Sequence, residues 1–241
     1  QLEHFILDEA DRMLDMGFAD DIKKIAEYLP KKRQNIMFSA TMPSKIRSLA
    51  KAIMHEPEEV NIAISQTAEG IMQAAYLTYG GQKNELVKHL LKGKDELSSI
   101  IIFTSRKNTV KELVRDLKRM KMDADGISSD LDQDEREDVL RRFRNKRLRI
   151  LVATDIISRG IDIDNIDLVM NYDVPNDPED YVHRVGRTAR AKSTGMALTF
   201  IDETGQRDFQ KIEQLIQKDV PKLPNPPEIG EGPAYNPAKG R

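Results

Sequence analysis

Four short polar segments hold the residue types that could do chemistry, and most follow an apolar run. They are residues 8–11, 39–41, 154–162 and 183–190. In the first, the carboxylates of Asp8 and Glu9 could hold Mg²⁺ on a nucleotide and orient a water, or could do no more than cap a helix. In the second, Ser39 and Thr41 come just before Pro43, a pattern that on its own predicts only the start of a helix.

The third segment combines a hydroxyl, acidic side chains, an arginine and a glycine directly after the apolar run 150–153. Backbone amides around Gly160 could meet a phosphate, and Asp162 could accept a hydrogen bond from a ribose hydroxyl. The alternative is a tight turn between a strand and a helix, held by a salt bridge.

Arginines stand at every third position of the fourth segment, as Arg184, Arg187 and Arg190. On a helix they would project along one face, where their charges repel unless anions meet them. Phosphate is the expected anion, because a guanidinium group matches its oxygens in pairs. A solvated basic face or a set of internal salt bridges is the alternative.

The elements that position these residues are short β-rich runs that alternate with amphipathic helical stretches. The predicted strands are residues 5–7, 35–38, 75–79, 100–103, 150–153, 168–172 and 196–201. This alternation is typical of an α/β fold, a parallel sheet with helices on both faces. Ligands of such sheets bind at the carboxyl ends of the strands, where several of the polar segments are expected.

A polar stretch near residues 65–70 predicts a domain boundary. Residues 1–64 are too few for a complete α/β domain, 65–74 read as a linker, and 75–220 suit one doubly wound unit. The tail, 221–241, holds more than half of the 11 prolines and is expected to be extended or disordered. Because the apolar run 5–7 has no preceding partner, we expect the sequence to be a fragment.

The composition limits the classes of partner and chemistry. The 38 basic and 40 acidic side chains nearly cancel, so any polyanion must be held by a local arrangement of charge. The absence of cysteine excludes disulfides, cysteine zinc sites and thiol catalysis. Apolar runs fall far short of the roughly 20 residues that cross a bilayer, so we expect no membrane segment and a cytoplasmic protein.

Two features bear on RNA. The basic run 141–149 could be an RNA-binding patch or a solvated helix end and loop. Aromatic residues make up only 5% of the chain and tryptophan is absent, which argues against a platform for base stacking. Contacts to the sugar-phosphate backbone are the expected mode of RNA binding.

In order and approximate spacing, the four segments resemble the motifs of the DEAD-box RNA helicases. The segments Ile101-Ile102-Phe103-Thr104-Ser105-Arg106 and Gln133-Asp134-Glu135-Arg136 fit the same series, and the resemblance runs from Gln1 to about Ile201. It looks closest to the bacterial RhlE-like branch. The resemblance implies an ATP-dependent RNA helicase with two RecA-like domains, of which the chain holds the complete second domain and the C-terminal part of the first.

The resemblance also implies roles for single residues. Asp8 would coordinate Mg²⁺ through water, and Glu9, at the same metal, would orient and activate the attacking water. Arg187 and Arg190 would be arginine fingers on ATP, which Gly160 and Asp162 would also approach. Asp11, Ser39, Thr41 and His183 would couple the nucleotide to domain closure. RNA would lie across Ser105, Arg106, Gln133 and Thr154, with little sequence preference. The resemblance leaves the protein partners unknown, with ribosome-assembly or RNA-decay proteins as possible kinds.

The sequence departs from the family pattern in three places. Ala189 stands where the family often has glycine, and Ser128-Ser129 stand where His-Gly is common, which leaves an RNA contact by Ser129 in doubt. The chain contains no glycine-rich phosphate loop. We therefore predict negligible ATP hydrolysis by this chain alone. The alternative function is a non-catalytic RecA-like module that binds RNA or protein, but such a module has no need for catalytic carboxylates or arginine fingers.

Overall fold

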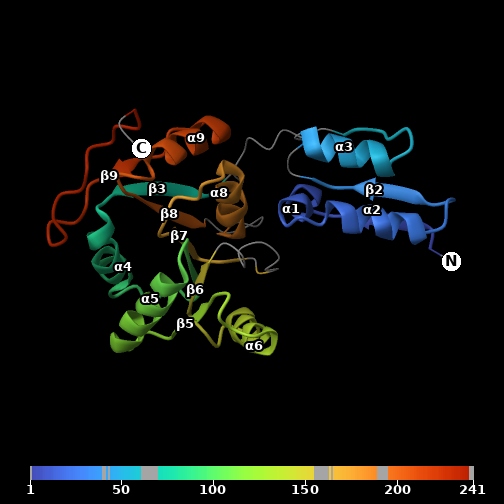
Figure 1. Ribbon diagram of the computed structural model, residues 1–241. Helices are drawn as coiled ribbons and strands as arrows, with labels where there is room; N and C mark the ends of the chain where they lie inside the picture. Colours follow the sequence, from blue (N-terminus) through green and yellow to red (C-terminus); the bar gives the residue numbers. More distant parts are fainter. Residues whose placement is uncertain are drawn as a thin grey trace. The chain divides into compact units, whose positions relative to one another are not determined.

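Residues 2–39, 42, 44–60, 70–154, 163, 165–188 and 195–238 are described by a computed structural model. Thr41, Gly160, Asp162 and Arg190 lie outside the described residues, so their predicted roles stay predictions. The chain divides into two units, residues 1–64 and 65–241 (Figure 1).

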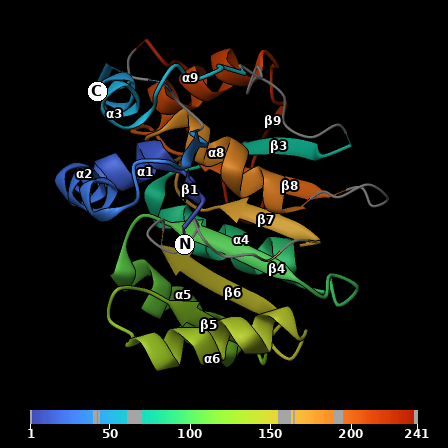
Figure 2. The same ribbon diagram turned by 90° about the vertical axis from the view of Figure 1, so that its right-hand side faces the viewer.

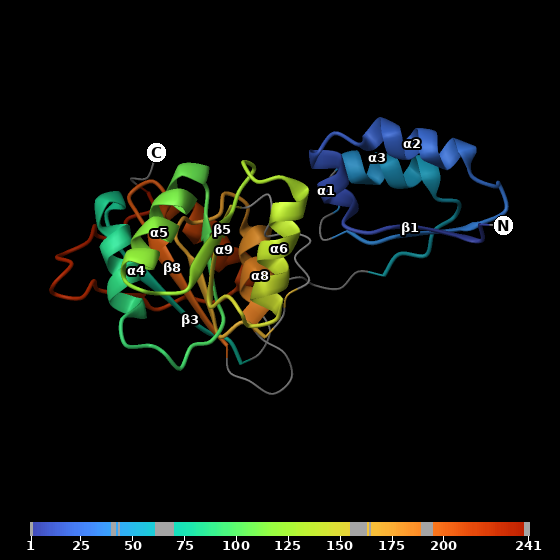
Figure 3. The same ribbon diagram turned by 90° about the horizontal axis from the view of Figure 1, so that it is seen from below.

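The first unit is a pair of parallel strands with helices on one side. Strands β1 (His4–Leu7) and β2 (Gln34–Met37) pair so that Leu7 lies opposite Met37. Helices α1 (Ala10–Asp15), α2 (Ala19–Tyr28) and α3 (Ser44–Ile53) lie on one side of the strands (Figure 3). The core contains Leu7, Ala10, Ile22, Ile46, Leu49 and Ile53. Because side chains alternate along a strand, Ile6 points away from this core and is 55% exposed.

The second unit is built on a seven-stranded sheet in which every pair is parallel. The strands are β3 (Met72–Leu77), β4 (Ile100–Thr104), β5 (Ala124–Ile127), β6 (Ile150–Thr154), β7 (Leu168–Asn171), β8 (Met196–Ile201) and β9 (Lys222–Leu223). Their order across the sheet is β5-β6-β4-β7-β8-β3-β9, which Figure 2 shows from β5 to β3. The central strands β4 and β6 are buried along their whole length, as expected for parallel strands covered on both faces.

Helices cover both faces of this sheet. They are η1 (Gly80–Gln82), α4 (Lys83–Leu91), α5 (Lys107–Arg119), α6 (Gln133–Arg144), α8 (Pro178–Val185), η2 (Gly186–Thr188) and α9 (Gln206–Ile216). Along β4, Ile100 and Ile102 pack with α4 and α5, whereas Ile101 and Phe103 pack with α6 on the opposite face (Figure 3). The predicted α/β fold, a parallel sheet with helices on both faces, is confirmed.

Strand β5 and the start of β3 differ most from the prediction. Strand β5 was not predicted, because Asp125-Gly126 reads as a turn signal. In the structure, a Cβ at Gly126 would come within 2.6 Å of a side-chain carbon of Val110, so glycine lets α5 pack closely on the strand. Strand β3 begins at Met72, inside the expected linker 65–74, because Met72 pairs with Met196 of β8.

Over the described residues 221–238 the proline-rich tail follows the extended alternative of the prediction and not the disordered one. It adds β9 to the sheet and then runs over the second unit. The side chain of Gln82 donates to the carbonyl oxygens of Ile229 (3.0 Å) and Glu231 (3.2 Å), and the Tyr235 hydroxyl donates to Glu213 (3.0 Å). Proline lacks an N–H but keeps its carbonyl, so an extended proline-rich segment still packs where side chains satisfy its backbone.

Candidate functional site

The acidic segment and the serine of the first unit lie together at the carboxyl ends of β1 and β2. Asp8 and Glu9 directly follow β1, and Ser39 follows β2 after one residue. The backbone N–H of Ala10 donates to the carbonyl of Phe38 (3.0 Å), and the N–H of Asp11 donates to the Ser39 hydroxyl (3.2 Å). The two segments, about 30 positions apart in the sequence, are therefore held side by side by the parallel pairing.

Glu9 has an unfavourable backbone conformation. Its φ of 48° and ψ of 49° fall in the left-handed region, which non-glycine residues rarely occupy. Strain of this kind is stored at functional sites more often than elsewhere. The Glu9 carboxylate accepts a hydrogen bond from the Arg12 guanidinium (3.0 Å) and stays 45% exposed, so it is both oriented and accessible.

Asp8 is exposed, and one of its carboxylate oxygens accepts from the backbone N–H of Glu9 (2.9 Å). No cluster of three or more metal-ligating side chains is found among the described residues. Mg²⁺ commonly keeps several waters and binds through one or two carboxylates together with substrate phosphates. The accessible Asp8 carboxylate therefore fits a magnesium ion that arrives with a nucleotide.

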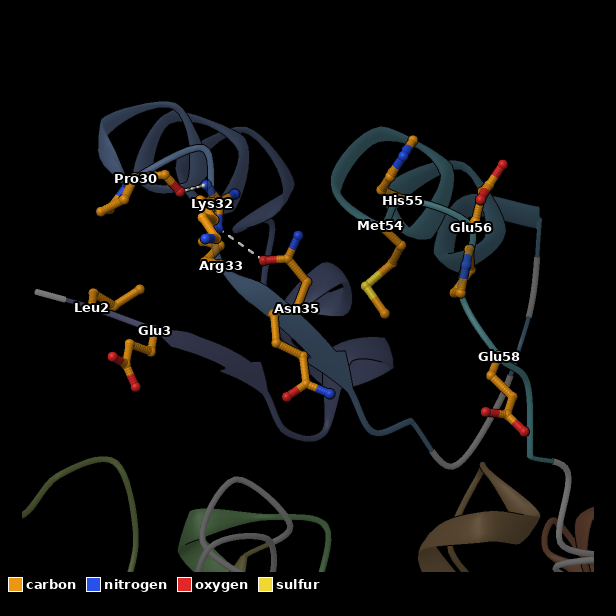
Figure 4. Close-up of a pocket in the computed structure, with 12 residues that line it drawn as sticks. Leu2, Glu3, Pro30, Lys32, Arg33, Asn35, Met54, His55, Glu56 and Glu58 are labelled. Atoms are coloured by element: carbon orange, nitrogen blue, oxygen red, sulfur yellow. Dashed lines mark hydrogen bonds between the residues drawn. The ribbon is translucent and has the colours of Figure 1, made fainter.

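A cavity of about 920 Å³ in the first unit lies at the other end of the strands (Figure 4). Glu3 and Gln34 line it where β1 and β2 begin, and Met54, His55 and Glu56 line it after the end of α3. Since the acidic residues follow the ends of the strands, this cavity is separate from the predicted chemistry.

In the second unit, two of the predicted RNA-binding positions meet at the carboxyl edge of the sheet. β4 and β6 are neighbours with Thr104 opposite Thr154, and Ser105 follows β4 on the surface. Thr154 is 7% exposed, and its hydroxyl has no hydrogen-bond partner in the part of the chain that the structure describes. A buried hydroxyl without a partner is costly, which marks this position as a site for a ligand or water.

The other two predicted RNA-binding residues begin helices beside this edge. Arg106 is exposed and directly precedes α5, and Gln133 is the first residue of α6. The side-chain amide of Gln133 donates to Glu137 (2.8 Å), so it is presently turned along its own helix. The first turn of α5 presents backbone N–H groups that favour an anion.

Much of the basic run 141–149 is used inside the unit. Arg142 pairs with Asp125 and Asp138, Arg141 pairs with Asp138, and Arg149 donates to the carbonyl of Leu97 (2.8 Å). These contacts favour the solvated helix end over a dedicated RNA patch.

A buried charge cluster that sequence reasoning missed stands next to the Ser105 loop. Lys83 is 3% exposed, and its amine lies 3.0 Å from Asp173 and 2.6 Å from Asp202. The second oxygen of Asp173 accepts from the hydroxyl of Thr104 (2.8 Å) and from both the N–H (2.8 Å) and the hydroxyl (2.9 Å) of Ser105. The signal was present in the sequence, because Asp173 and Asp202 each follow the end of an apolar strand.

Both carboxylates of this cluster stay ionised in the folded protein. Burial alone would raise the pKa of Asp173, but the Lys83 charge and the hydrogen bonds from Ser105 and Thr104 outweigh it and lower the pKa. Burial likewise acts to raise the pKa of Asp202, and Lys83, Thr204 and the Gly205 N–H lower it.

The arginine segment does not form one anion-binding face. Arg184 is 1% exposed, donates to the side chain of Asn171 (3.0 Å), and lies over the ring of Phe103 at 5.1 Å. The prediction that it faces phosphate is wrong, because the side chain is buried against Asn171 and Phe103. Helix α8 ends at Val185, so Arg187 lies in the following η2 turn, where it is half-buried.

His183 is exposed on α8 of the second unit, whereas Asp11 and Ser39 belong to the first. The predicted coupling among them stays a prediction.

Two family models match the chain. The model for the DEAD/DEAH box helicase matches residues 1–49, and the model for the helicase conserved C-terminal domain matches residues 82–192. The chain belongs to the DEAD-box helicase family. The acidic segment of the first unit lies within the first matched region. Ser105 and Thr154, at the sheet edge of the second unit, lie within the other.

Relatives and solved structures extend this DEAD-box match over nearly the whole chain. The DEAD-box ATP-dependent RNA helicase CshA of Geobacillus kaustophilus is 40% identical over 236 residues, which cover 96% of this chain and 50% of that protein. Dbp5 of S. cerevisiae, solved with RNA and ADP BeF3, superposes with a TM-score of 0.82 at 29% identity and covers 92% of this chain and 60% of its own. The E. coli DEAD-box protein SrmB bound to RraA gives a TM-score of 0.62 at 27% identity over 69% of this chain and 99% of its own.

These matches confirm the RecA-like fold class. The chain spans less than two thirds of CshA and of Dbp5. The assignment to an RhlE-like branch stays a prediction. No described helix is long and apolar enough to cross a membrane.

Proposed function

We propose that the whole protein is an ATP-dependent RNA helicase, and that this chain supplies its acidic pair and the RNA-facing edge of its second RecA-like domain. The observation that carries the proposal is the buried, unpartnered hydroxyl of Thr154, among the described residues, beside the exposed Ser105 loop. Hydroxyls and helix N-termini at a sheet edge suit contacts to a sugar-phosphate backbone, which implies little sequence preference.

The proposed chemistry is hydrolysis of ATP. Mg²⁺ on the nucleotide would supply charge neutralisation at the phosphates, and Asp8 would hold it through water. Glu9, whose carboxylate Arg12 orients, would accept a proton from the attacking water. Arg187 and Arg190 would place positive charge against the γ-phosphate, where it offsets the charge of the transition state. A cytoplasmic location and protein partners also stay proposals.

The test is RNA-stimulated ATP hydrolysis by the whole protein. Arg187→Ala is expected to lower the stimulated rate by on the order of 10³ to 10⁵, the usual contribution of an arginine finger. Arg119→Ala removes the same charge from a 70% exposed position at the far end of α5, and is expected to leave the rate unchanged. Glu9→Gln is expected to abolish turnover.

Three results would count against parts of this proposal. If Arg187→Ala leaves turnover intact, Arg187 does not act as an arginine finger. RNA binding without any turnover in a folded protein would favour the non-catalytic module that binds RNA or protein. Hydrolysis by the 241-residue chain alone, abolished by Glu9→Gln, would contradict the prediction that this chain needs a phosphate loop.

A further inference from the structure

Two hydroxyl side chains at the proposed RNA-binding edge differ in their hydrogen bonds. Thr154 ends β6 and its hydroxyl has no partner among the described residues. Ser105 follows the neighbouring β4, is exposed, and has its hydroxyl oxygen 2.9 Å from a carboxylate oxygen of Asp173. The two residues are similar in type and lie on adjacent strands, so the difference between them comes from Asp173.

The Asp173 carboxylate fixes the direction of the Ser105 hydrogen bond. An ionised carboxylate can only accept hydrogen bonds, so two oxygens 2.9 Å apart attract each other only if the serine donates its proton. The backbone N–H of Ser105 donates to the same oxygen at 2.8 Å and holds the residue in place. The serine oxygen then keeps its lone pairs and has no proton left to donate elsewhere.

The surrounding charges keep Asp173 in this state. Lys83, which is almost fully buried, lies 3.0 Å from the other Asp173 oxygen and also contacts Asp202. These contacts lower the pKa of Asp173 despite its burial. Protonated Asp173 could donate to Ser105, but near neutral pH that form is not populated.

The two hydroxyls therefore suit different parts of a nucleic acid. Phosphate oxygens only accept, so they can pair with Thr154 and are repelled by the oxygen of Ser105. A ribose 2′-hydroxyl can donate, and deoxyribose offers no donor at that place. We propose that Asp173 determines sugar specificity, by making Ser105 an acceptor that takes the 2′-hydroxyl of RNA. This inference rests on the proposed function and goes beyond it by giving the contact a direction and a cause.

The experiment measures the affinity of the whole protein for oligouridylate, oligodeoxyuridylate and 2′-fluoro-oligouridylate of equal length, by fluorescence anisotropy. The fluorinated strand keeps an RNA-like sugar but cannot donate. Ser105→Ala is expected to weaken RNA binding roughly 3- to 10-fold, the loss of one hydrogen bond, and to leave binding of the other two strands unchanged. Thr154→Val, which keeps the side-chain shape, is expected to weaken binding of all three oligonucleotides by the same factor.

Matched variants test the role of Asp173. Asp173→Ala removes the acceptor and is expected to lower the ratio of RNA to DNA affinity as far as Ser105→Ala does. Asp202→Ala also removes one of the two partners of Lys83 but does not touch Ser105, so the ratio is expected to persist. Because a ratio of affinities does not depend on the fraction of protein that is folded, lost stability cannot produce the effect.

The outcomes separate this inference from the proposed function. If Ser105→Ala weakens binding of RNA and DNA equally, or if Asp202→Ala changes the ratio as much as Asp173→Ala, the specificity role is refuted while RNA binding stands. If the wild-type whole protein binds none of the strands, the RNA-binding part of the proposed function fails, and the specificity role fails with it.

Discussion

Replacing Lys83 by methionine should be among the most destabilising single changes in the second unit. The amine is 3% exposed and lies within 3.0 Å of both Asp173 and Asp202, whose side chains are 24% and 23% exposed. Methionine fills similar space but leaves two largely buried carboxylates facing each other without a cation. Breaking a buried ion pair from one side costs about 3–5 kcal/mol, and we expect a loss of unfolding free energy in that range.

The loss of unfolding free energy in Lys83→Met should depend on pH. In the wild-type protein the pKa values of Asp173 and Asp202 are lowered, so their contribution to stability is present above the pKa of an unfolded aspartate and is lost as the pH falls through the folded pKa. Without Lys83, both pKa values are expected to be higher than in the wild-type protein, so protonation should relieve the repulsion in the variant at a higher pH. The difference between the two proteins should therefore be largest near neutral pH and shrink below about pH 4.

The assay is urea unfolding followed by far-ultraviolet circular dichroism at several pH values. Lys88→Met is the matched control on the same helix, because Lys88 is 25% exposed and pairs with Glu85 and Asp116 near the surface. Surface pairs contribute about 0–1 kcal/mol, so its loss should be small. If Lys83→Met cost no more than the control, or if its cost stayed constant between neutral pH and about pH 4, the reasoning about the buried cluster would be refuted.

Three further predictions concern backbone positions. Gly126→Ala should destabilise the second unit by about 1–3 kcal/mol, because its Cβ would lie 2.6 Å from Val110, whereas Gly81→Ala, which has open space, should be near neutral in the same urea titration. Gly232→Ala places a Cβ 1.7 Å from a carbonyl oxygen of β3, so the tail should detach and be cut faster in limited proteolysis, with the circular dichroism of the sheet unchanged. Glu9→Gly removes the strain of the left-handed conformation and should stabilise the first unit by about 1 kcal/mol in thermal unfolding. An equal gain in stability in Glu9→Ala would show that strain is not the cause.

Most strands of the two units, though not β5 and β9, and the edge that carries the polar segments could be predicted from the sequence. Buried parallel strands are apolar on both faces, so β4, β6 and β8 stand out as short apolar runs. The residues directly after such a run must lie at the carboxyl edge of the sheet. For this reason the sequence alone predicts that Ser105 and Thr154 lie at the same edge.

Contacts that depend on distant residues could not be predicted in this way. Arg184 and Arg187 are the same residue type, three positions apart. Arg184 is nevertheless buried, because its guanidinium group contacts Asn171 of β7 and Phe103 of β4. In the sequence, Lys83 looks like an ordinary helix residue. Only the order of the strands in the sheet brings Asp173 and Asp202 close to its amine. The sequence leaves open whether the tail is extended or disordered, because its order depends on contacts with Gln82 and Glu213.

ATP-dependent separation of a short RNA duplex by the whole protein tests the central claim most directly. The wild-type protein should release the shorter strand when ATP and Mg²⁺ are present, and Glu9→Gln should bind the duplex without releasing it. Release that does not require ATP, or release that Glu9→Gln leaves intact, would contradict the proposal that this chain belongs to an ATP-driven RNA helicase.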